Sequence, residues 1–291
     1  MRLDIFLREK FPESSRAHWQ RKVKNGEVLI NGEVVKNAHL ELNGDEKVEV
    51  IEEKKNEIAG EISSTELPFP VLYEDEYLLV IDKPAGIAVH KPANGKTVIE
   101  FLEQARPFAK LVHRLDKDTS GVLVAAKSET VHAKLSAKWK ARNVKKTYFA
   151  LVKGVFEIQK GRIEAPIHRS MKDRTKMAVS GRKGSRDSVT EFEVMETFKN
   201  DTSLLRVDLL TGRTHQIRVH LSSIMHPVIC DAVYGNEDLN KKFERLFGLK
   251  RQFLHSGKLT FTHPETGKEI TIKSKLPQDL QEVLDLLKNQ N

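Results

Sequence analysis

The chain has 291 residues, of which 31% are charged and 39% hydrophobic, and its formal net charge is +8 at pH 7. This length can bury a sizeable core and allows two domains. We expect neither secretion nor a membrane anchor, because the N-terminus opens no apolar stretch of signal-peptide type and no apolar run approaches membrane-spanning length. Cys230 is the only cysteine, which excludes an internal disulfide and a cysteine-only metal site and makes the cytoplasm the expected location.

The positive charge is concentrated in one segment. Residues 134–186 carry 16 Lys and Arg against 3 Asp and Glu. A surplus of this kind is typical either of a soluble lysine-rich surface or of a face that binds phosphates. The segment also contains Tyr148, Phe149 and His168, and it has few acids to neutralise it, which favours a nucleic-acid partner.

Residues 1–52 are expected to form a small separate domain. Apolar spacing predicts a helix near the N-terminus and a second helix over 16–24, which Ser14-Ser15 can cap. Asn31-Gly32 predicts a hairpin with a tight primed turn. Trp19 is better explained as a core residue than as a platform for stacking bases.

The second helix of this domain carries a local basic cluster, although the domain as a whole is close to neutral. The order of its elements is similar to the alpha-L RNA-binding domain of the ribosomal small-subunit protein type. That resemblance rests on Arg2-Leu3-Asp4, Ser14-Ser15-Arg16, Gly26-Glu27-Val28, Asn31-Gly32, Lys36 and Gly44-Asp45. It implies that the helix meets RNA phosphates through Arg16, Arg21, Lys22 and Lys24. Residues 53–66 are polar and aperiodic, which is typical of a linker.

A run of nine residues, His113-Arg114-Leu115-Asp116-Lys117-Asp118-Thr119-Ser120-Gly121, precedes a short aliphatic strand at 122–126. Its last three residues favour a turn, so its charged side chains are expected on a loop at the mouth of a buried strand. A solvated charged turn is the plainer interpretation. However, Arg114 and Asp116 face the same side of an extended chain, and a guanidinium beside a carboxylate favours the ionised acid.

A second notable run spans 211–221. Thr214 can cap a helix whose apolar stripe contains Ile217 and Leu221. His215 and His220 are five residues apart and do not share a helix face, and no third ligand is near, so we reject a metal site here.

These two runs, with Lys83-Pro84-Ala85-Gly86 and Lys146-Thr147-Tyr148, resemble the motifs of the RluA-type RNA pseudouridine synthases over nearly the whole chain. The resemblance implies an α+β fold, with a catalytic domain at 67–291 built on a mixed, mostly antiparallel sheet flanked by helices and loops. It implies that Lys83 is mainly structural. The family usually has glycine where this chain has Cys230, which we interpret as a small buried substitute.

The same resemblance assigns roles to site residues. Asp116 would be the catalytic carboxylate, Arg218 its pairing arginine, and Tyr148 the aromatic side chain against the target base. Arg114 would fill the space left by the extruded nucleotide. RNA contacts are also expected from His113, Arg213 and His215. Whether Asp116 attacks C1′ or removes the C2′ proton stays open, as does a part for Tyr148 in removing the C5 proton.

The reaction implied by the resemblance breaks a carbon–nitrogen glycosidic bond, rotates the uracil and forms a carbon–carbon bond, so no cofactor, metal or energy source is expected. Large-subunit ribosomal RNA is the expected substrate, with transfer RNA as the alternative, and a monomer is expected. Two other hypotheses are a non-catalytic RNA-binding or ribosome-assembly protein and a nuclease or RNA glycosidase. An ordinary glycosidase needs two cooperating carboxylates, for which Asp118 is the only close candidate.

Overall fold

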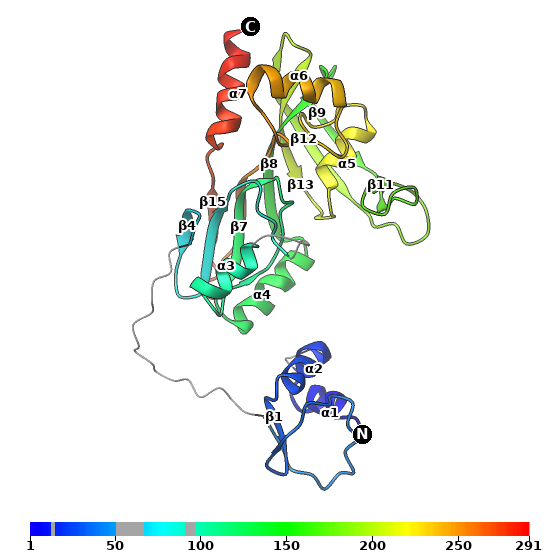
Figure 1. Cartoon of the computed structure of the whole chain (residues 1–291), viewed down its shortest axis with the longest axis vertical. Helices are drawn as coiled ribbons and strands as arrows, with labels where there is room; N and C mark the ends of the chain where they lie inside the picture. The colour runs from blue at the N-terminus through cyan, green and yellow to red at the C-terminus, as the bar shows by residue number, and fades with distance from the viewer. Residues whose placement is uncertain (13–14, 51–66, 91–96, 291) are drawn as a thin grey trace. The chain divides into compact units, whose positions relative to one another are not determined.

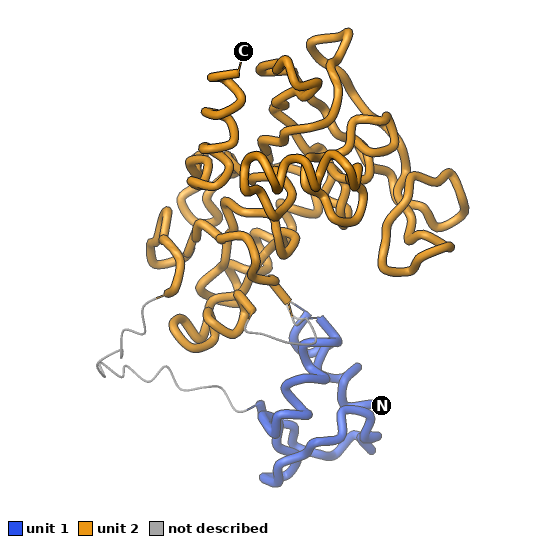
Figure 2. Tube along the Cα trace, turned by 45° about the horizontal axis from the view of Figure 1, so that its top comes forward, with its two compact units in different colours: residues 1–63 blue, residues 64–291 orange. Residues whose placement is uncertain are grey.

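The computed structural model describes residues 1–12, 15–50, 67–90 and 97–290 and divides the chain into two compact units, Met1–Ser63 and Ser64–Asn291 (Figures 1 and 2). The linker expected at 53–66 lies outside the described residues. No helix in the described ranges is long and apolar enough to cross a membrane.

The first unit contains two helices and a small antiparallel sheet of order β2-β1-β3. Its elements are α1 (Leu3–Lys10), α2 (Arg16–Lys24), β1 (Val28–Ile30), β2 (Glu33–Val34) and β3 (Val48–Val50). The Ser15 side chain caps α2 by accepting a hydrogen bond from the His18 N–H. Asn31 and Gly32 have φ angles of 52° and 87°, as a primed turn requires. Trp19 is 5% exposed in the core, so the predicted helix, hairpin and core position are confirmed.

The second unit is built on one large mixed sheet. Among the described residues its strands follow the order β4-β5-β7-β14-β8-β13-β12-β9, with β15 beside β14 and β6 beside β7. Every pair is antiparallel except β7 with β14. The strands are β4 (Val71–Glu74), β5 (Leu78–Lys83), β6 (Lys110–Leu111), β7 (Ser120–Ala126), β8 (Val144–Lys153), β9 (Lys160–Glu164), β12 (Val189–Phe198), β13 (Thr202–Leu209), β14 (Leu254–Thr262) and β15 (Glu269–Lys273). The expected mixed, mostly antiparallel sheet is confirmed.

Helices cover this sheet in separate groups. They are α3 (Val98–Ala105), α4 (Glu129–Lys140), α5 (Gln216–Ser223), α6 (Glu237–Phe247) and α7 (Gln278–Asn289). Figure 1 shows α3 and α4 at one end of the sheet and α6 and α7 at the other. A two-stranded hairpin, β10 (Ile167–Arg169) and β11 (Met177–Val179), projects from the body beside α5.

Apolar spacing at Val98, Phe101, Leu102 and Ala105 predicts a helix over 97–108, and α3 occupies the first part of that range. Thr97 and Glu100 form a capping box, in which each side chain binds the backbone N–H of the other residue. The apolar pattern predicts a helix as far as Phe108, but the helix ends at Ala105. Arg106 precedes Pro107 and has non-helical angles, φ −147° and ψ 74°, because a following proline disfavours the helical conformation.

Candidate active site

Residues 113–119 of the nine-residue run form a loop fixed at several points, whereas Ser120 and Gly121, which were expected in a turn, are the first residues of strand β7. The Lys117 carbonyl accepts hydrogen bonds from Lys83 Nζ at 2.9 Å and from the Gly86 N–H at 3.0 Å. Lys83 is fully buried, and its ammonium also donates to the Pro84 and Ile87 carbonyls. Burial lowers the pKa of Lys83 to about 8. The three carbonyl contacts support the expectation that Lys83 has a structural part, namely joining two loops.

The far end of this loop enters strand β7 at a point where only glycine fits. Gly121 has φ 116°, and a Cβ there would lie 2.2 Å from the Ser256 carbonyl oxygen. This close approach arises because β7 and β14 pair in parallel, with Gly121 opposite Ser256. Ser120 is hydrogen-bonded to His255 at 2.9 Å. The loop therefore cannot slide along β14 without losing buried contacts.

A second loop, 211–215, leads into α5 from the other side of the site. The predicted Thr214 cap is wrong, because the helix begins at Gln216 and its N-cap residue is His215. His215 has φ 55°, in the left-handed region that most side chains avoid, and its side chain makes no cap hydrogen bond. Gln216 fixes the loop instead, since its amide accepts from the Arg213 N–H and donates to the Val189 carbonyl.

The two loops meet at an ion-pair network. Arg218 donates from Nη1 to Asp116 Oδ2 at 3.0 Å, from Nε to Asp231 Oδ2 at 2.7 Å and from Nη2 to Asp231 Oδ1 at 2.8 Å. Burial opposes the charge on Arg218, but the hydrogen bonds and charge of Asp231, together with Asp116, raise its pKa above the ordinary value. One guanidinium thus bridges two carboxylates, and the predicted contact between Asp116 and Arg218 is confirmed.

Asp116 is the more accessible of the two carboxylates. Its side chain is 18% exposed, whereas that of Asp231 is 0% exposed. Burial alone would raise the pKa of Asp231, but Arg218 and the backbone N–H groups of Tyr234 and Val233 lower it. Asp231 is therefore an ionised support for the arginine, and Asp116 is the carboxylate that a substrate can reach.

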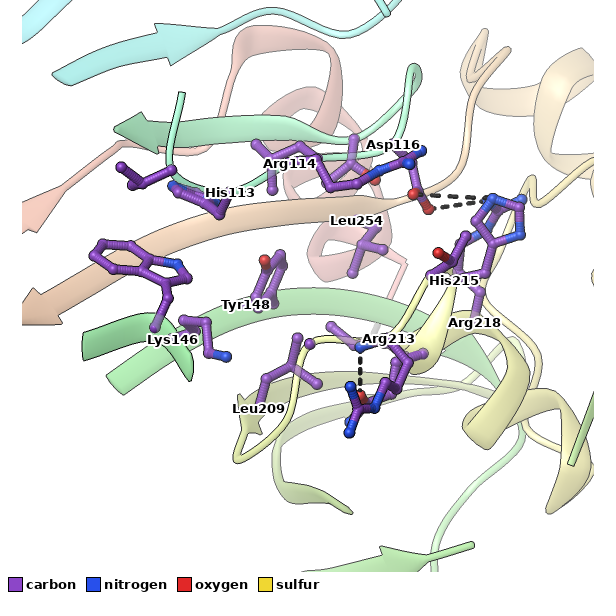
Figure 3. A pocket seen from close by; sticks show the side chains of 18 residues that line it. His113, Arg114, Asp116, Lys146, Tyr148, Leu209, Arg213, His215, Arg218 and Leu254 are labelled. Carbon is purple, nitrogen blue, oxygen red and sulfur yellow. Dashed lines mark hydrogen bonds and ion pairs between the residues drawn. The ribbon is translucent and has the colours of Figure 1, made fainter. Parts of the chain in front are cut away.

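A cleft of about 250 Å³ opens in front of Asp116 (Figure 3). Tyr148, on β8, lines the cleft and is 7% exposed. Burial raises the pKa of Tyr148 to about 12, with a smaller contribution from the Asp116 charge and an opposing one from a hydrogen bond with Ser256. The tyrosine therefore presents a neutral phenol ring to the cleft. Its position is suitable for stacking on a planar group that lies near Asp116.

Lys146 lines the same cleft at a distance from Asp116, and the sequence analysis assigned it no role of its own. Its Nζ donates to the Thr211 carbonyl at 3.3 Å. Burial and the neighbouring Arg142 lower its pKa to about 8. A partly buried cation here makes the cleft attractive to an anionic ligand.

Arg114, Arg213 and His215, three residues expected to contact RNA, also line the cleft. Arg114 is exposed, and it lines the cleft together with Asp116 (Figure 3). Arg213 donates from Nε to the Asp187 carbonyl at 3.2 Å. His215 Nε2 is 3.9 Å from Asp116 Oδ1, which is beyond hydrogen-bond distance.

His113, the fourth such residue on these loops, has contacts within the protein. Its Nε2 accepts a hydrogen bond from the Val124 N–H at 3.1 Å, and its ring stacks on Trp139. Burial, with the charge of Lys146, lowers the pKa of His113 to about 3, so the ring is neutral. Although it borders the cleft, its polar atom serves to hold the loop against β7.

The basic cluster of the first unit includes two residues that have acidic partners. Arg16 Nε is 2.9 Å from the buried Asp4, and Lys22 Nζ is 2.7 Å from Glu27. Burial alone would raise the pKa of Asp4, but hydrogen bonds from Gln20, Arg16 and Arg2 lower it to about 2. Arg21 and Lys24 are exposed.

Sequence reasoning missed two residues of the site, Asp231 and Tyr234. Asp231 orients Arg218, and the Tyr234 hydroxyl lies 2.9 Å from His215 Nδ1. Both residues lie in 226–235, a run that also resembles the family but in which the resemblance assigned a role to neither of them. The available signal was an acid and an aromatic residue, Asp231 and Tyr234, that follow Arg218 in the sequence. No local pattern connects either of them to Asp116.

Cys230 is buried beside this network and takes no part in it. Its Sγ donates to the Leu249 carbonyl at 3.2 Å, and burial raises the pKa of its thiol to about 12. Its φ of 56° lies in the region that favours glycine. These contacts support the interpretation of Cys230 as a small buried residue.

The fold and site define a class of protein, namely an enzyme whose cleft is lined by an arginine-paired carboxylate and a buried tyrosine, with a separate small unit that carries a basic helix. The comparisons specify the class. Residues 77–223 match the family model described as RNA pseudouridylate synthase, and residues 1–48 match that of the S4 domain. The chain belongs to the RNA pseudouridylate synthase family and is an isomerase that acts on RNA.

Similar proteins extend over the full chain. Ribosomal large subunit pseudouridine synthase D of Xanthomonas campestris is 39% identical over 99% of this chain and 89% of its own length. Ribosomal large subunit pseudouridine synthase C of Salmonella typhi is 35% identical over 99% of this chain and 93% of its own. The solved structure of Human RNA Pseudouridylate Synthase Domain Containing 4 has a TM-score of 0.63 and 26% identity, covering 75% of this chain and 92% of that one.

Proposed function

We propose that Asp116 is the catalytic carboxylate with which this chain converts uridine to pseudouridine in large-subunit ribosomal RNA. The observation that carries the assignment is the contact between Asp116 and Arg218 at 3.0 Å, at the accessible end of a network that is otherwise buried. The Arg218 guanidinium places an opposite charge next to this carboxylate. A negatively charged oxygen beside the ribose is what cleavage of a glycosidic bond requires.

The target nucleotide must leave its stack to reach Asp116. Tyr148 would stack on the extruded uracil, and Arg114 would occupy the space that the base leaves. Asp116 then either attacks C1′ or removes the C2′ proton while the carbon–nitrogen bond breaks. The uracil rotates, C5 bonds to C1′, and the C5 proton is lost. The C5 proton passes to water, because the Tyr148 phenol is neutral and would first have to give up its own proton to accept it.

The choice of RNA is supported by the relatives, two of which are named as synthases of the ribosomal large subunit. Transfer RNA is the alternative substrate. The first unit would strengthen RNA binding through Arg21 and Lys24, which are exposed. Arg16 and Lys22 would contribute where RNA phosphates replace or share their acidic partners, Asp4 and Glu27. One chain supplies every group used here, so a monomer is sufficient, and the single cysteine favours the cytoplasm.

Release of tritium from C5-labelled uridine in ribosomal RNA transcripts tests the catalytic assignment. Asp116→Asn should abolish release and keep RNA binding, because it removes the charge but preserves the shape. Asp118→Asn, in the same loop, is the matched control and should retain release. Full release by Asp116→Asn would refute the assignment, and free uracil as product would indicate a glycosidase.

Pseudouridine mapping identifies the RNA. Cells that lack the gene should lose one or more pseudouridines in large-subunit ribosomal RNA, and the wild-type gene should restore them, whereas Asp116→Asn should not. Loss confined to transfer RNA would overturn the proposed substrate without affecting the catalytic assignment.

A further inference from the structure

The Tyr234 hydroxyl occupies a junction between the active site and the projecting hairpin. It accepts a hydrogen bond from the Met177 N–H at 2.8 Å, on strand β11 of the hairpin. The same oxygen lies 2.9 Å from His215 Nδ1. Its ring lies over the Arg218 guanidinium, 5.1 Å from Cζ. One side chain therefore contacts the hairpin, the loop before α5 and the arginine that pairs with Asp116.

These contacts are consistent with one arrangement of the protons, in which Tyr234 donates to His215. The Met177 N–H can only donate, so the Tyr234 oxygen accepts there and its own hydrogen is free for His215. Burial lowers the pKa of His215 although Asp116 opposes this shift, so the imidazole is neutral. With Nδ1 accepting from Tyr234, the ring carries its proton on Nε2, which is 3.9 Å from Asp116 Oδ1. In this arrangement the Nε2–H group of the neutral His215 ring faces the Asp116 carboxylate.

The hairpin is an RNA-facing element by its charge. Its strands and tip, residues 167–179, carry Arg169, Lys172, Arg174 and Lys176 against Asp173 alone, and Lys172 and Arg174 are exposed. Strand β11 of the hairpin contacts α5, the helix that carries Arg218. The basic tip can bind a phosphate backbone, and Met177 is the β11 residue next to that tip.

We propose that the Tyr234 hydroxyl is a positioning group that couples RNA binding on the β10–β11 hairpin to the orientation of Asp116, acting through His215. This proposal rests on the catalytic assignment of Asp116 made above. His215, in a left-handed conformation, is held there by Tyr234 on one side and faces Asp116 on the other. A shift of the hairpin on RNA binding would be passed from Met177 to Tyr234 and His215, and so to the group that faces Asp116.

A double-mutant cycle tests the coupling. Tyr234→Phe keeps the ring over Arg218 but removes the hydroxyl, and Lys172→Ala with Arg174→Ala removes charge from the hairpin tip. Two quantities are measured for each protein, namely the RNA dissociation constant and the single-turnover rate of tritium release at saturating RNA. Lys241→Ala with Lys242→Ala, both exposed on α6, is the matched charge control.

Coupling predicts that Tyr234→Phe slows the single-turnover rate by about tenfold, the equivalent of one hydrogen bond, with little change in affinity. The hairpin variant should weaken affinity and also slow the saturated rate, and this second loss should disappear in the Tyr234→Phe background. The α6 control should leave the rate unchanged. A hairpin effect on affinity alone, no hairpin effect, or equal rate losses in both backgrounds would overturn the coupling.

A substitute variant and the activity of the wild-type chain separate the possible outcomes. If Tyr234→Phe fails to fold, His215→Gln interrupts the same chain at its next link and replaces it in the cycle. A wild-type chain that releases no tritium would count against the proposed function. Additive losses in an active wild-type chain would count against the coupling only.

Discussion

Asp231 and Arg218 form a bidentate ion pair, in which Asp231 Oδ2 lies 2.7 Å from Arg218 Nε and Asp231 Oδ1 lies 2.8 Å from Arg218 Nη2. This pair leaves Nη1 to donate to Asp116. Because the guanidinium is planar and rigid, fixing two of its nitrogens also fixes the third. Asp231, which no substrate needs to touch, therefore determines the direction from which Arg218 meets Asp116.

Replacing Asp231 with Ala should both destabilise the catalytic unit and abolish turnover. The change leaves the buried Arg218 charge with one partner, a loss on the order of 3–5 kcal/mol. We expect the urea midpoint to fall and tritium release to disappear. Glu237→Gln, in an exposed pair with Lys241, is the control and should leave both unchanged. Wild-type midpoint and rate in Asp231→Ala would show that Arg218 is oriented by other groups.

Adding one methyl group at Gly121 should displace the loop that carries Asp116. Gly121→Ala places Cβ 2.2 Å from the Ser256 carbonyl at a positive φ, so β7 and β14 must separate locally. Tritium release should fall steeply and the melting temperature should drop. At Gly181 a Cβ meets nothing within 4 Å, so Gly181→Ala should behave as wild type. An active Gly121→Ala enzyme would mean that the loop tolerates a shift.

Acidification should destabilise the catalytic unit through His255. This ring is fully buried against Ser120, and burial lowers its pKa to about 4. In the unfolded chain the pKa of the imidazole is near 6.5, whereas in the folded protein it is about 4. The unfolded state therefore binds more protons in this window, and the free energy of unfolding decreases as pH falls from 6.5 to 4.

His255→Asn should flatten this pH dependence. Urea unfolding at intervals between pH 7 and pH 4 measures it, with His90→Gln, an exposed position, as the control that keeps the wild-type slope. The wild-type loss attributable to His255 should be on the order of 1–3 kcal/mol. An unaltered slope in His255→Asn would assign the acid sensitivity to other groups.

Tyr148 should contribute to RNA binding through its ring rather than its hydroxyl. In an Asp116→Asn background, which leaves the uridine intact, Tyr148→Phe should bind target RNA as the parent does. Tyr148→Ala should bind it more weakly by about 1–3 kcal/mol, the usual contribution of one stacked base. Filter binding at a fixed salt concentration measures the difference. Equal affinities for the Ala and Phe variants would indicate that the base does not stack there.

The sequence by itself determined the features that short-range physics controls. Ser15 caps α2 because its hydroxyl can reach the His18 N–H three residues later, and Asn31-Gly32 makes a primed turn because both residues tolerate positive φ. The aliphatic run 122–126 likewise predicted a buried strand with a charged loop before it, although that strand begins at Ser120, inside the expected turn. The motif resemblance then selected Asp116 over Asp118, which composition could not do.

Only the tertiary structure decided which groups share the site. Arg218 lies 102 residues from Asp116 and 13 from Asp231, and no periodicity relates these positions. α5 starts at Gln216, with His215 rather than Thr214 as its N-cap residue, because Gln216 binds β12. The inward role of His113 follows from its contact with Val124. Local patterns set which conformations each segment favours, whereas burial and long-range hydrogen bonds determine which side chains meet, and these arise only when the whole sheet has formed.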